Sequence, residues 1–353
     1  MRFEEFRPNL EMVSLIGEID EFKGSWRSLS NINPERLATL KRVATIESVG
    51  SSTRIEGAVL SDQEVEALLS GTAIRSFKSR DEQEVAGYAG VMERLFTSWQ
   101  HMPFAENDIK QLHRDLLQHS TKDDRHRGHY KTVPNHVEAF GPDGEHLGIV
   151  FKTVSPFDTP FQMTELVTWT NQHLDGGSIH PLLVVAVFIV GFLAIHPFQD
   201  GNGRLSRVLT TLLLLKQGYS YVPYSSLESV IESNKESYYL ALRKTQATLD
   251  SEQPAWDPWI EFFLKCMQKQ KANLQVKIER EHLLDGELPK LSAQILDLVR
   301  QQGRLQTSDI QRLTGESRST IKVHISELVR RKILSRHGRG PATWYTMSRQ
   351  PIT

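Results

Sequence analysis

The alternation of apolar and polar stretches along the chain predicts a mainly helical protein. The most apolar stretch, Leu182 to Ile195, contains no charged side chain. It is shorter than the roughly 20 residues that a membrane-spanning helix needs, so it predicts a buried core helix. A second apolar helix is expected over Leu205 to Lys216, and the polar residues 196–204 form the loop between the two helices.

Apolar residues at helical spacing predict further helices before and after this pair. They are expected near residues 34–49, 61–69, 79–100, 106–117, 160–175, 229–248 and 259–284. Residues 1–33 are polar and predict irregular backbone, and the small residues of 50–57, after the first helix, permit close approach to another surface. Two short apolar runs around a tip with Gly and Pro predict a β-hairpin over 136–151.

The residues after Ser292 predict a small separate domain. Its helices are expected at 292–302, 308–313 and 318–331, with a connector at 303–306, caps at Thr307 and Ser317, and a hairpin over 333–346. Three helices and a hairpin are the plan of a helix-turn-helix domain with a wing. The chain is therefore divided into an N-terminal helical region (1–75), a central helical core (76–284) and a winged helix-turn-helix domain (285–353).

Charge is unevenly distributed, although the whole chain carries a formal net charge of only -1. Residues 290–353 contain twelve Lys and Arg against four Asp and Glu, a balance of +8. A basic domain on an acidic body favours a separate contact with double-stranded DNA, and a solvated basic tail is the alternative interpretation.

Cysteine content and the N-terminal sequence limit the location of the protein and the kind of site it holds. The single cysteine, Cys266, excludes an internal disulfide and a cysteine-rich metal site. The first ten residues are too polar and too acidic for a signal peptide. A cytoplasmic protein without membrane contact is therefore expected.

The polar loop between the two most apolar helices carries the candidate chemistry. Residues 196–207 read His-Pro-Phe-Gln-Asp-Gly-Asn-Gly-Arg-Leu-Ser-Arg. Glycines before a helix start leave backbone N–H groups and the positive end of the helix dipole free to bind phosphate. Arginines can grip further phosphate oxygens, an acid can hold a magnesium ion, and a histidine can accept a proton from a hydroxyl. These parts suit an attack on a nucleoside triphosphate, whereas an isolated histidine after an apolar run is more often a packing or capping residue.

The pattern His-x-Phe-x-Asp-Gly-Asn-Gly-Arg-x-x-Arg resembles the signature of the Fic (filamentation induced by cAMP) domain family, and every fixed position is met. The resemblance implies an all-helical core with a β-hairpin flap, and transfer of AMP from ATP to a Ser, Thr or Tyr hydroxyl of a target protein. It also implies roles by position. The base would be His196, the Mg²⁺ ligand Asp200, the anion-binding backbone Gly201, Asn202 and Gly203, and the phosphate partners Arg204 and Arg207.

A second stretch, Ser-Thr-Arg-Ile-Glu-Gly over residues 52–57, is similar to the inhibitory motif of the same family. Ser52, Glu56 and Gly57 match its fixed positions, and its place before the core resembles the class with an N-terminal inhibitory helix. A glutamate paired with Arg207 would neutralise the charge meant for the γ-phosphate and would occupy its space. Without the signature at 196–207, an ordinary loop with a capping serine would be the better interpretation.

Two further regions gain a role only from the resemblance. The edge of the hairpin would pair with an extended segment of the target through main-chain hydrogen bonds. Asn234, Tyr238 and Tyr239 would line the adenine pocket, although packing of an amphipathic helix explains tyrosines there equally well.

Candidate DNA-binding residues lie in the C-terminal domain. Arg318, Ser319 and Lys322 are near the start of the expected recognition helix, the part that reaches base edges in such domains. Arg336 and Arg339 in the wing would meet phosphate. The same fold also serves protein binding and dimerisation, so a homodimer is compatible with the sequence, although no segment requires one.

Two functions are compatible with this sequence. The first is an adenylyltransferase that is autoinhibited by Glu56. The second is a DNA-binding transcriptional regulator that senses nucleotide with little turnover. The intact His196 and Asp200 favour the enzyme, because a sensor has no need of a base. Removal of AMP from a target, or a nucleotide donor other than ATP, is compatible with the same residues.

Overall fold

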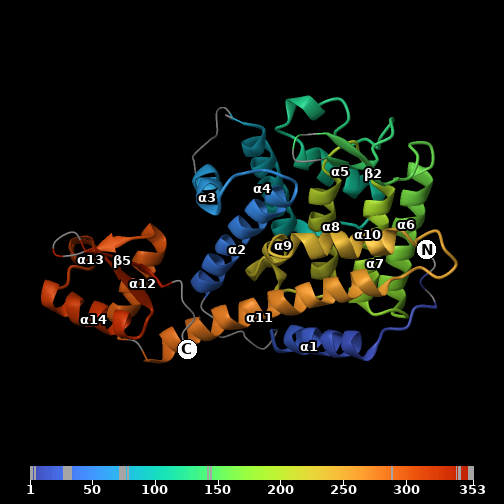
Figure 1. Cartoon of the computed structure of the whole chain (residues 1–353). Helices are drawn as coiled ribbons and strands as arrows, with labels where there is room; N and C mark the ends of the chain where they lie inside the picture. Colours follow the sequence, from blue (N-terminus) through green and yellow to red (C-terminus); the bar gives the residue numbers. More distant parts are fainter. Residues whose placement is uncertain are drawn as a thin grey trace. The chain divides into compact units, whose positions relative to one another are not determined.

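The mainly helical architecture expected from the apolar pattern is present in the computed structural model of the chain (Figure 1). It describes residues 3, 5–26, 34–70, 77, 79–140, 143, 145–287, 289–338, 340 and 343–348. The chain forms two compact units, Met1–Leu274 and Gln275–Thr353. The three-domain division stays a prediction, because residues 1–75 belong to the first unit and helix α11 (Asp257–Glu287) contains both the observed boundary and the predicted one at 284/285.

The first unit consists of helices and one hairpin. Its helices are α1 (Leu10–Trp26), α2 (Pro34–Ile55), α3 (Asp62–Ser70), α4 (Arg80–Ser98), α5 (Glu106–Leu116), α6 (Thr159–Gly176), α7 (Pro181–Ile195), α8 (Asn202–Lys216), α9 (Leu227–Glu232), α10 (Lys235–Gln246) and the first part of α11. A capping box begins α3: the Ser61 N–H donates to the Glu64 carboxylate, and the Glu64 N–H donates to Ser61 Oγ.

Helix α7 is the centre of the first unit. Every residue from Leu182 to Ile195 is buried. The helix packs against α6, α8 and α10, and the indole N–H of Trp259 in α11 donates to the Ala186 carbonyl at 2.8 Å. A helix that is apolar on all sides must be covered on all sides, and these neighbours supply the cover. No described helix has both the length and the apolarity needed to cross a membrane.

Helix α1 contradicts the prediction of irregular backbone over residues 1–33. Its buried residues form a narrow stripe at helical spacing: Met12, Leu15, Ile19 and Phe22. On the neighbouring helix α11, Lys265 pairs with Glu11 and Lys271 lies 3.8 Å from Glu18. The stripe is too narrow to stand out from the polar residues around it, so the surface of α11 is what makes this segment a helix.

Helix α2 ends at Ile55, six residues beyond its predicted end at Val49. Its last two turns are buried, and the helix packs against α4 and α9. Small side chains allow this close packing, and the Thr53 hydroxyl donates to the Val49 carbonyl within the helix. The helix ends just before Gly57, whose φ of +106° suits glycine.

Two other helix limits also differ from the sequence pattern. Helix α8 begins at Asn202 rather than Leu205, so the glycine-rich stretch forms its first turn. The single helix predicted over 229–248 is two helices, α9 and α10. They separate at Asn234, whose side-chain amide donates to the Val230 carbonyl at 2.8 Å. A short amide side chain that bonds to backbone in this way competes with helix continuation.

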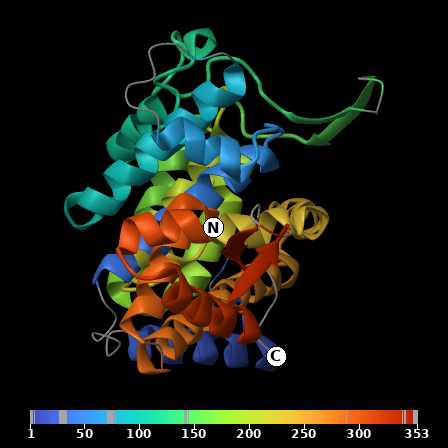
Figure 2. The ribbon, with the colours of Figure 1, turned by 90° about the vertical axis from the view of Figure 1, so that its left-hand side faces the viewer.

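The predicted hairpin is present as strands β1 (Val137–Phe140) and β2 (His146–Phe151). The strands are antiparallel, with Val137 opposite Phe151, and the register is irregular at two places. Figure 2 shows the hairpin extending beyond the helices of its unit. The residues that flank the two strands lie near the end of α7, since Lys131 donates from Nζ to both Thr153 Oγ1 and the Ile195 carbonyl.

In its described residues, the second unit contains the end of α11, three further helices and a small sheet. Its elements are α12 (Lys290–Gln302), β3 (Leu305–Gln306), α13 (Thr307–Thr314), α14 (Arg318–Arg330), β4 (Leu334–His337) and β5 (Trp344–Met347). The sheet has the antiparallel order β3-β5-β4 and closes a core that includes Ile295, Ile310 and Ile321. The predicted connector is therefore partly a strand. Gln306 with Asp309, not Thr307, caps α13, whereas Ser317 caps α14 as predicted.

His113 of α5 fixes the loop after α7 to the rest of the first unit. Its side chain is fully buried and its ring stacks on Phe198 with centroids 3.8 Å apart. The Gly128 N–H donates to Nδ1 at 2.8 Å, so Nε2 carries the proton and donates to the Asp200 carbonyl at 2.9 Å. Burial lowers the pKa of His113 from 6.5 to about 4. The neutral ring is thus a structural part of the loop.

We predict that the protein loses stability in acid through His113. The unfolded chain binds a proton near pH 6.5 and the folded chain only near pH 4, so the free energy of unfolding falls as the pH drops from 6.5 to 4. For one such group the loss is on the order of 3 kcal/mol. Urea unfolding between pH 4.5 and 7.5 measures it. His113→Gln should flatten the pH dependence, and the exposed His101→Gln should not; an unchanged slope in His113→Gln would contradict the assignment.

Candidate functional site

The loop after α7 is built by residues that end one helix and begin the next. His196 adopts a left-handed conformation with φ of 53°, which stops α7, and Gly201 does the same with φ of 78° just before α8. Phe198 is fully buried, and Asn202 bonds to both the N–H and the carbonyl of Phe198, at 2.9 and 2.7 Å. The hydrogen bonds of Asn202 and the buried Phe198 ring therefore fix the backbone of the loop, and the side chains on it have defined positions.

His196 has the properties of a proton acceptor. Its ring is half-buried, and its Nδ1 lies 3.3 Å from the Leu193 carbonyl. A proton on Nδ1 would be directed at that carbonyl, leaving the lone pair of Nε2 for a substrate. Burial lowers the pKa of His196 from 6.5 to about 4, so the ring is neutral at pH 7. Neutral imidazole is the form that can take a proton from a hydroxyl.

Arg207, in the second turn of α8, is held by the end of α2. The side chain is only 5% exposed. Its Nε donates to Ser52 Oγ and its Nη2 donates to both the Ser52 carbonyl and Glu56 Oε1, each at 2.8 Å. Burial opposes the charged form, but the Glu56 carboxylate raises the pKa of Arg207 above its ordinary value. The structure therefore brings together Ser52, Glu56 and Arg207, which are about 150 residues apart in the chain.

Glu56 also lies against the first turn of α8. A Cβ atom on Gly203 would be 2.1 Å from Glu56 Oε1, so only glycine allows this approach. Free N–H groups and the positive dipole end of α8 are directed at this place, which favours an anion there. A carboxylate of the protein thus occupies a position with the electrostatic character of a phosphate site.

Both arginines of α8 have buried N–H groups that donate no hydrogen bond to a described residue. Within the described part of the chain, Nη1 of Arg207 and Nε of Arg204 are buried without a hydrogen-bond partner. Nη1 of Arg204 lies 3.0 Å from Glu84 as an ion pair, but the geometry is not that of a hydrogen bond. Buried guanidinium donors without partners are costly in a folded protein, so their presence indicates a site for an anionic ligand.

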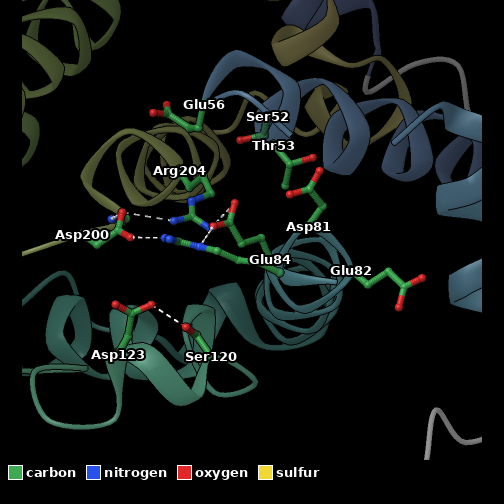
Figure 3. Close-up of polar contacts among 12 residues, drawn as sticks. Ser52, Thr53, Glu56, Asp81, Glu82, Glu84, Ser120, Asp123, Asp200 and Arg204 are labelled. Carbon is green, nitrogen blue, oxygen red and sulfur yellow. Dashed lines mark hydrogen bonds and ion pairs between the residues drawn. The ribbon is translucent and has the colours of Figure 1, made fainter. Parts of the chain in front are cut away.

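Asp200 faces a ring of charged groups in Figure 3. Arg80 donates to one of its oxygens at 2.6 Å, and Arg204 lies 3.3 Å from the other. Glu84 on α4 completes the ring through both arginines. Burial would raise the pKa of Asp200, but Arg204, the Gly201 N–H and Arg80 together lower it, so the carboxylate is ionised. No sequence motif marks Arg80 or Glu84, because only the packing of α4 in the folded chain brings them to Asp200.

The donor set at Asp200 fits a magnesium ion that is shared with a nucleotide. Among the described residues, no three His, Cys, Asp or Glu side chains form a group that would hold a metal by themselves. Mg²⁺ in nucleotide sites is commonly bound by one or two carboxylates together with phosphates. Asp200 is one partly exposed carboxylate beside an anion site, as this arrangement requires.

The base of the hairpin is bonded to the same loop. Lys131, which is buried, donates from Nζ to Asn135, Thr153 and the Ile195 carbonyl, all within 3.0 Å. The side-chain amide of Asn135 donates to the carbonyls of His196 and Phe198. The local sequence around Lys131 does not reveal this role, because two of its three acceptors, Thr153 and Ile195, lie 22 and 64 residues away.

The predicted adenine-pocket residues are near the end of α2 but are used for packing. Tyr238 is buried against Trp259, and burial raises its pKa to about 12. The Tyr239 hydroxyl donates to the Ile55 carbonyl at 3.3 Å, and the Asn234 amide donates to the Val230 carbonyl of α9. Their role toward a nucleotide stays a prediction.

The candidate DNA-binding residues that the structure describes are exposed on the second unit. Arg318 and Lys322 are one turn apart on α14, and Ser319 is exposed beside them. Arg336 is exposed on β4. Arg339 lies outside the described residues.

The chain is similar to named adenylyltransferases over most of its length. It is 26% identical over 253 residues to the protein adenylyltransferase Fic of Drosophila grimshawi, a match that covers 71% of this chain and 47% of that protein. It is 30% identical over 169 residues to the protein adenylyltransferase fic-1 of Caenorhabditis elegans, covering 47% and 30% of the two chains. The chain thus spans about half the length, or less, of these curated relatives.

Solved structures of similar fold agree with this likeness. A Fic family protein from Desulfovibrio desulfuricans superposes with a TM-score of 0.62 at 23% identity, covering 98% of each chain. A Fic domain containing signaling protein from Bacteroides thetaiotaomicron gives 0.59 at 25% identity, covering 72% of this chain and 94% of that one. The model of the Fic/DOC family matches residues 103–214, which include the loop at 196–207. The chain therefore contains a Fic/DOC family domain.

Proposed function

We propose that this protein is a protein adenylyltransferase, an AMPylator that transfers AMP from ATP to a Ser, Thr or Tyr hydroxyl of a target protein. The observation that carries the proposal is the anion site at the start of α8. Glu56 supplies a carboxylate there, while donors of two buried arginines still lack partners. Neutral His196 lies on the same loop. The names of the relatives support the same activity.

The chemistry divides among the residues of the loop. His196 takes the proton of the target hydroxyl through Nε2, and the hydroxyl oxygen attacks the α-phosphorus of ATP. The bond from the α-phosphorus to the bridging oxygen breaks, and pyrophosphate leaves. Arg204, Arg207 and the first N–H groups of α8 hold the phosphates and offset their charge. Bound at Asp200, Mg²⁺ would supply further neutralisation of that charge.

Two other activities use the same residues. Removal of AMP from a target would need a water molecule in place of the hydroxyl, and Glu56 could then position that water. A donor other than ATP is also compatible with the anion site, because phosphate contacts do not read the base.

We further propose that Glu56 and Ser52 hold the enzyme in an inhibited state. Arg207 donates three hydrogen bonds to Ser52 and Glu56, at and just after the end of α2. A γ-phosphate at Arg207 would have to displace the Glu56 carboxylate, since two anions cannot share that space. ATP that binds with Glu56 in place would be directed into an unproductive pose.

The hairpin is proposed to hold the target. An exposed strand edge can pair with an extended segment through main-chain hydrogen bonds. Lys131 and Asn135 bond the residues that flank the hairpin to the carbonyls of Ile195 and His196. A target segment on the hairpin would therefore be positioned with respect to the imidazole of His196. Location in the cytoplasm stays an expectation from the sequence.

The second unit is proposed to be a winged helix-turn-helix domain that binds double-stranded DNA. The exposed face of α14 with Arg318 and Lys322 supports this proposal, as does the balance of +8 over residues 290–353. A nucleotide-sensing transcriptional regulator with little turnover is the alternative for the whole chain, and a homodimer would suit such a regulator.

Labelled ATP should separate AMP transfer from other reactions. With the Glu56→Gly variant and a lysate as the source of targets, we expect label from the α position to be retained on protein and label from the γ position to be lost. His196→Ala should lower labelling by at least about 100-fold, because the base is gone, while ATP binding persists. Retention of γ-label would indicate phosphoryl transfer, and full labelling by His196→Ala would refute the base.

Loss of Glu56 should release the proposed inhibition. Glu56→Gly removes the carboxylate that competes with the γ-phosphate, so self-labelling with α-labelled ATP should rise by about ten-fold or more, on the scale of one charge-assisted hydrogen bond. Glu64→Gly, which removes an exposed glutamate of the α3 capping box, is the matched control and should have no such effect. Equal labelling of both variants and the wild type would count against inhibition by Glu56.

Binding of DNA should depend on α14 and on salt. We expect the full chain to bind duplex DNA with an affinity that falls steeply between 50 and 200 mM salt. The double change Arg318→Ala and Lys322→Ala should weaken binding by about 10-fold or more. Lys265→Ala, an exposed lysine on α11 in the first unit, is the control for loss of charge. Fluorescence anisotropy with a labelled duplex measures the affinity of the wild type, the double variant and the control. If the double variant binds DNA as tightly as the wild type, the second unit would be a protein-binding unit instead.

A further inference from the structure

We propose that Arg80 occupies the place of the metal ion on Asp200, as a cation built into the protein that a metal–nucleotide complex must displace. The inference rests on the proposed function and extends it. Glu56 fills the phosphate position with an anion, and Arg80 fills the metal position with a cation. The free site is thus neutralised by two of the protein's own side chains, one in the turn after α2 and one at the start of α4.

The two oxygens of Asp200 have different partners. Oδ1 accepts from the Gly201 N–H at 2.5 Å and from Arg204 at 3.3 Å, so the loop itself uses this oxygen. Oδ2 accepts from Arg80 at 2.6 Å, and no other described residue is bonded to it. A divalent ion that binds through Oδ2 would meet the guanidinium of Arg80 at once. Two cations cannot both contact one oxygen at such distances without strong repulsion, so Arg80 must leave.

Arg80 is able to leave, whereas Arg204 is not. Its side chain is 43% exposed, and the neighbouring Arg204 is only 3% exposed within α8. The Nε of Arg80 already donates to Glu84 at 2.8 Å. Glu84 therefore remains as a partner after the contact with Asp200 is broken. Rotation of one exposed side chain is sufficient, and no helix has to move.

The stability of α4 does not account for an arginine at this position. Arg80 is the first residue of α4, directly after the cap Ser79. A cation there lies at the positive end of the helix dipole, which is unfavourable. An arginine four residues before a glutamate is also the weaker order of an ion pair on a helix. The contact with Asp200, 120 residues away, is what this position provides.

The test separates binding of the metal from binding of the nucleotide. In a Glu56→Gly background, isothermal titration calorimetry gives the Kd of α,β-methylene-ATP, once with Mn²⁺ and once with EDTA. Arg80→Gln should tighten the Kd of the Mn²⁺ complex by about two- to five-fold, the range expected for an exposed ion pair. The Kd measured in EDTA should not tighten. Arg94→Gln removes another α4 arginine that pairs with a carboxylate, Asp115, and should leave both values unchanged.

Other outcomes overturn the proposal in distinguishable ways. Weaker binding of the Mn²⁺ complex to Arg80→Gln would mean that Arg80 supports the site, either by orienting Asp200 or by binding phosphate. An unchanged value would mean that Arg80 does not compete. In both cases Asp200→Asn should still abolish the advantage of Mn²⁺ over EDTA, so the metal assignment survives. If Asp200→Asn has no effect either, the metal role in the proposed function fails together with the inference.

Discussion

The pairing of buried Arg207 with the end of α2 is the interaction on which the candidate site depends. A guanidinium that is 5% exposed needs a compensating charge and hydrogen-bond acceptors. Ser52 and Glu56 supply them, and Gly203 makes room for the carboxylate. The same pairing brings the end of α2 to the first turns of α8. Under the proposed inhibition, these contacts would serve both structure and control.

A second constraint is the rigidity of the loop between α7 and α8. The loop has to leave a wholly buried helix, expose a base and an acid, and enter a second buried helix within six residues. Neutral His113 bonds to its backbone and stacks on Phe198, and Lys131 and Asn135 bond to its carbonyls. The proposed catalysis would require this kind of support, because small displacements of His196 or of the proposed phosphate contacts would lower the rate.

Charge within the site is arranged as alternating pairs. Arg207 faces Glu56, and Asp200 faces Arg80 and Arg204. Each group has its opposite nearby, so the site is close to neutral before a substrate enters. A ligand that carries both a cation and phosphates can replace these internal partners, whereas an anion or a cation alone can replace only part of them. Such an arrangement would favour a metal–nucleotide complex over either component.

The sequence by itself determined the helical class, the buried α7, the hairpin and the loop chemistry of residues 196–207, because each depends on local periodicity or on residues adjacent in the chain. It did not determine α1 or the last turns of α2. Both segments have weak local patterns and become helical by packing on α11, α4 and α9. Nor did it reveal Arg80, His113 or Lys131, whose partners at the end of α7 and in the loop after it lie 64 to 120 residues away. Only the tertiary structure decides such contacts, since charge and hydrogen bonding act through space and leave no period along the chain.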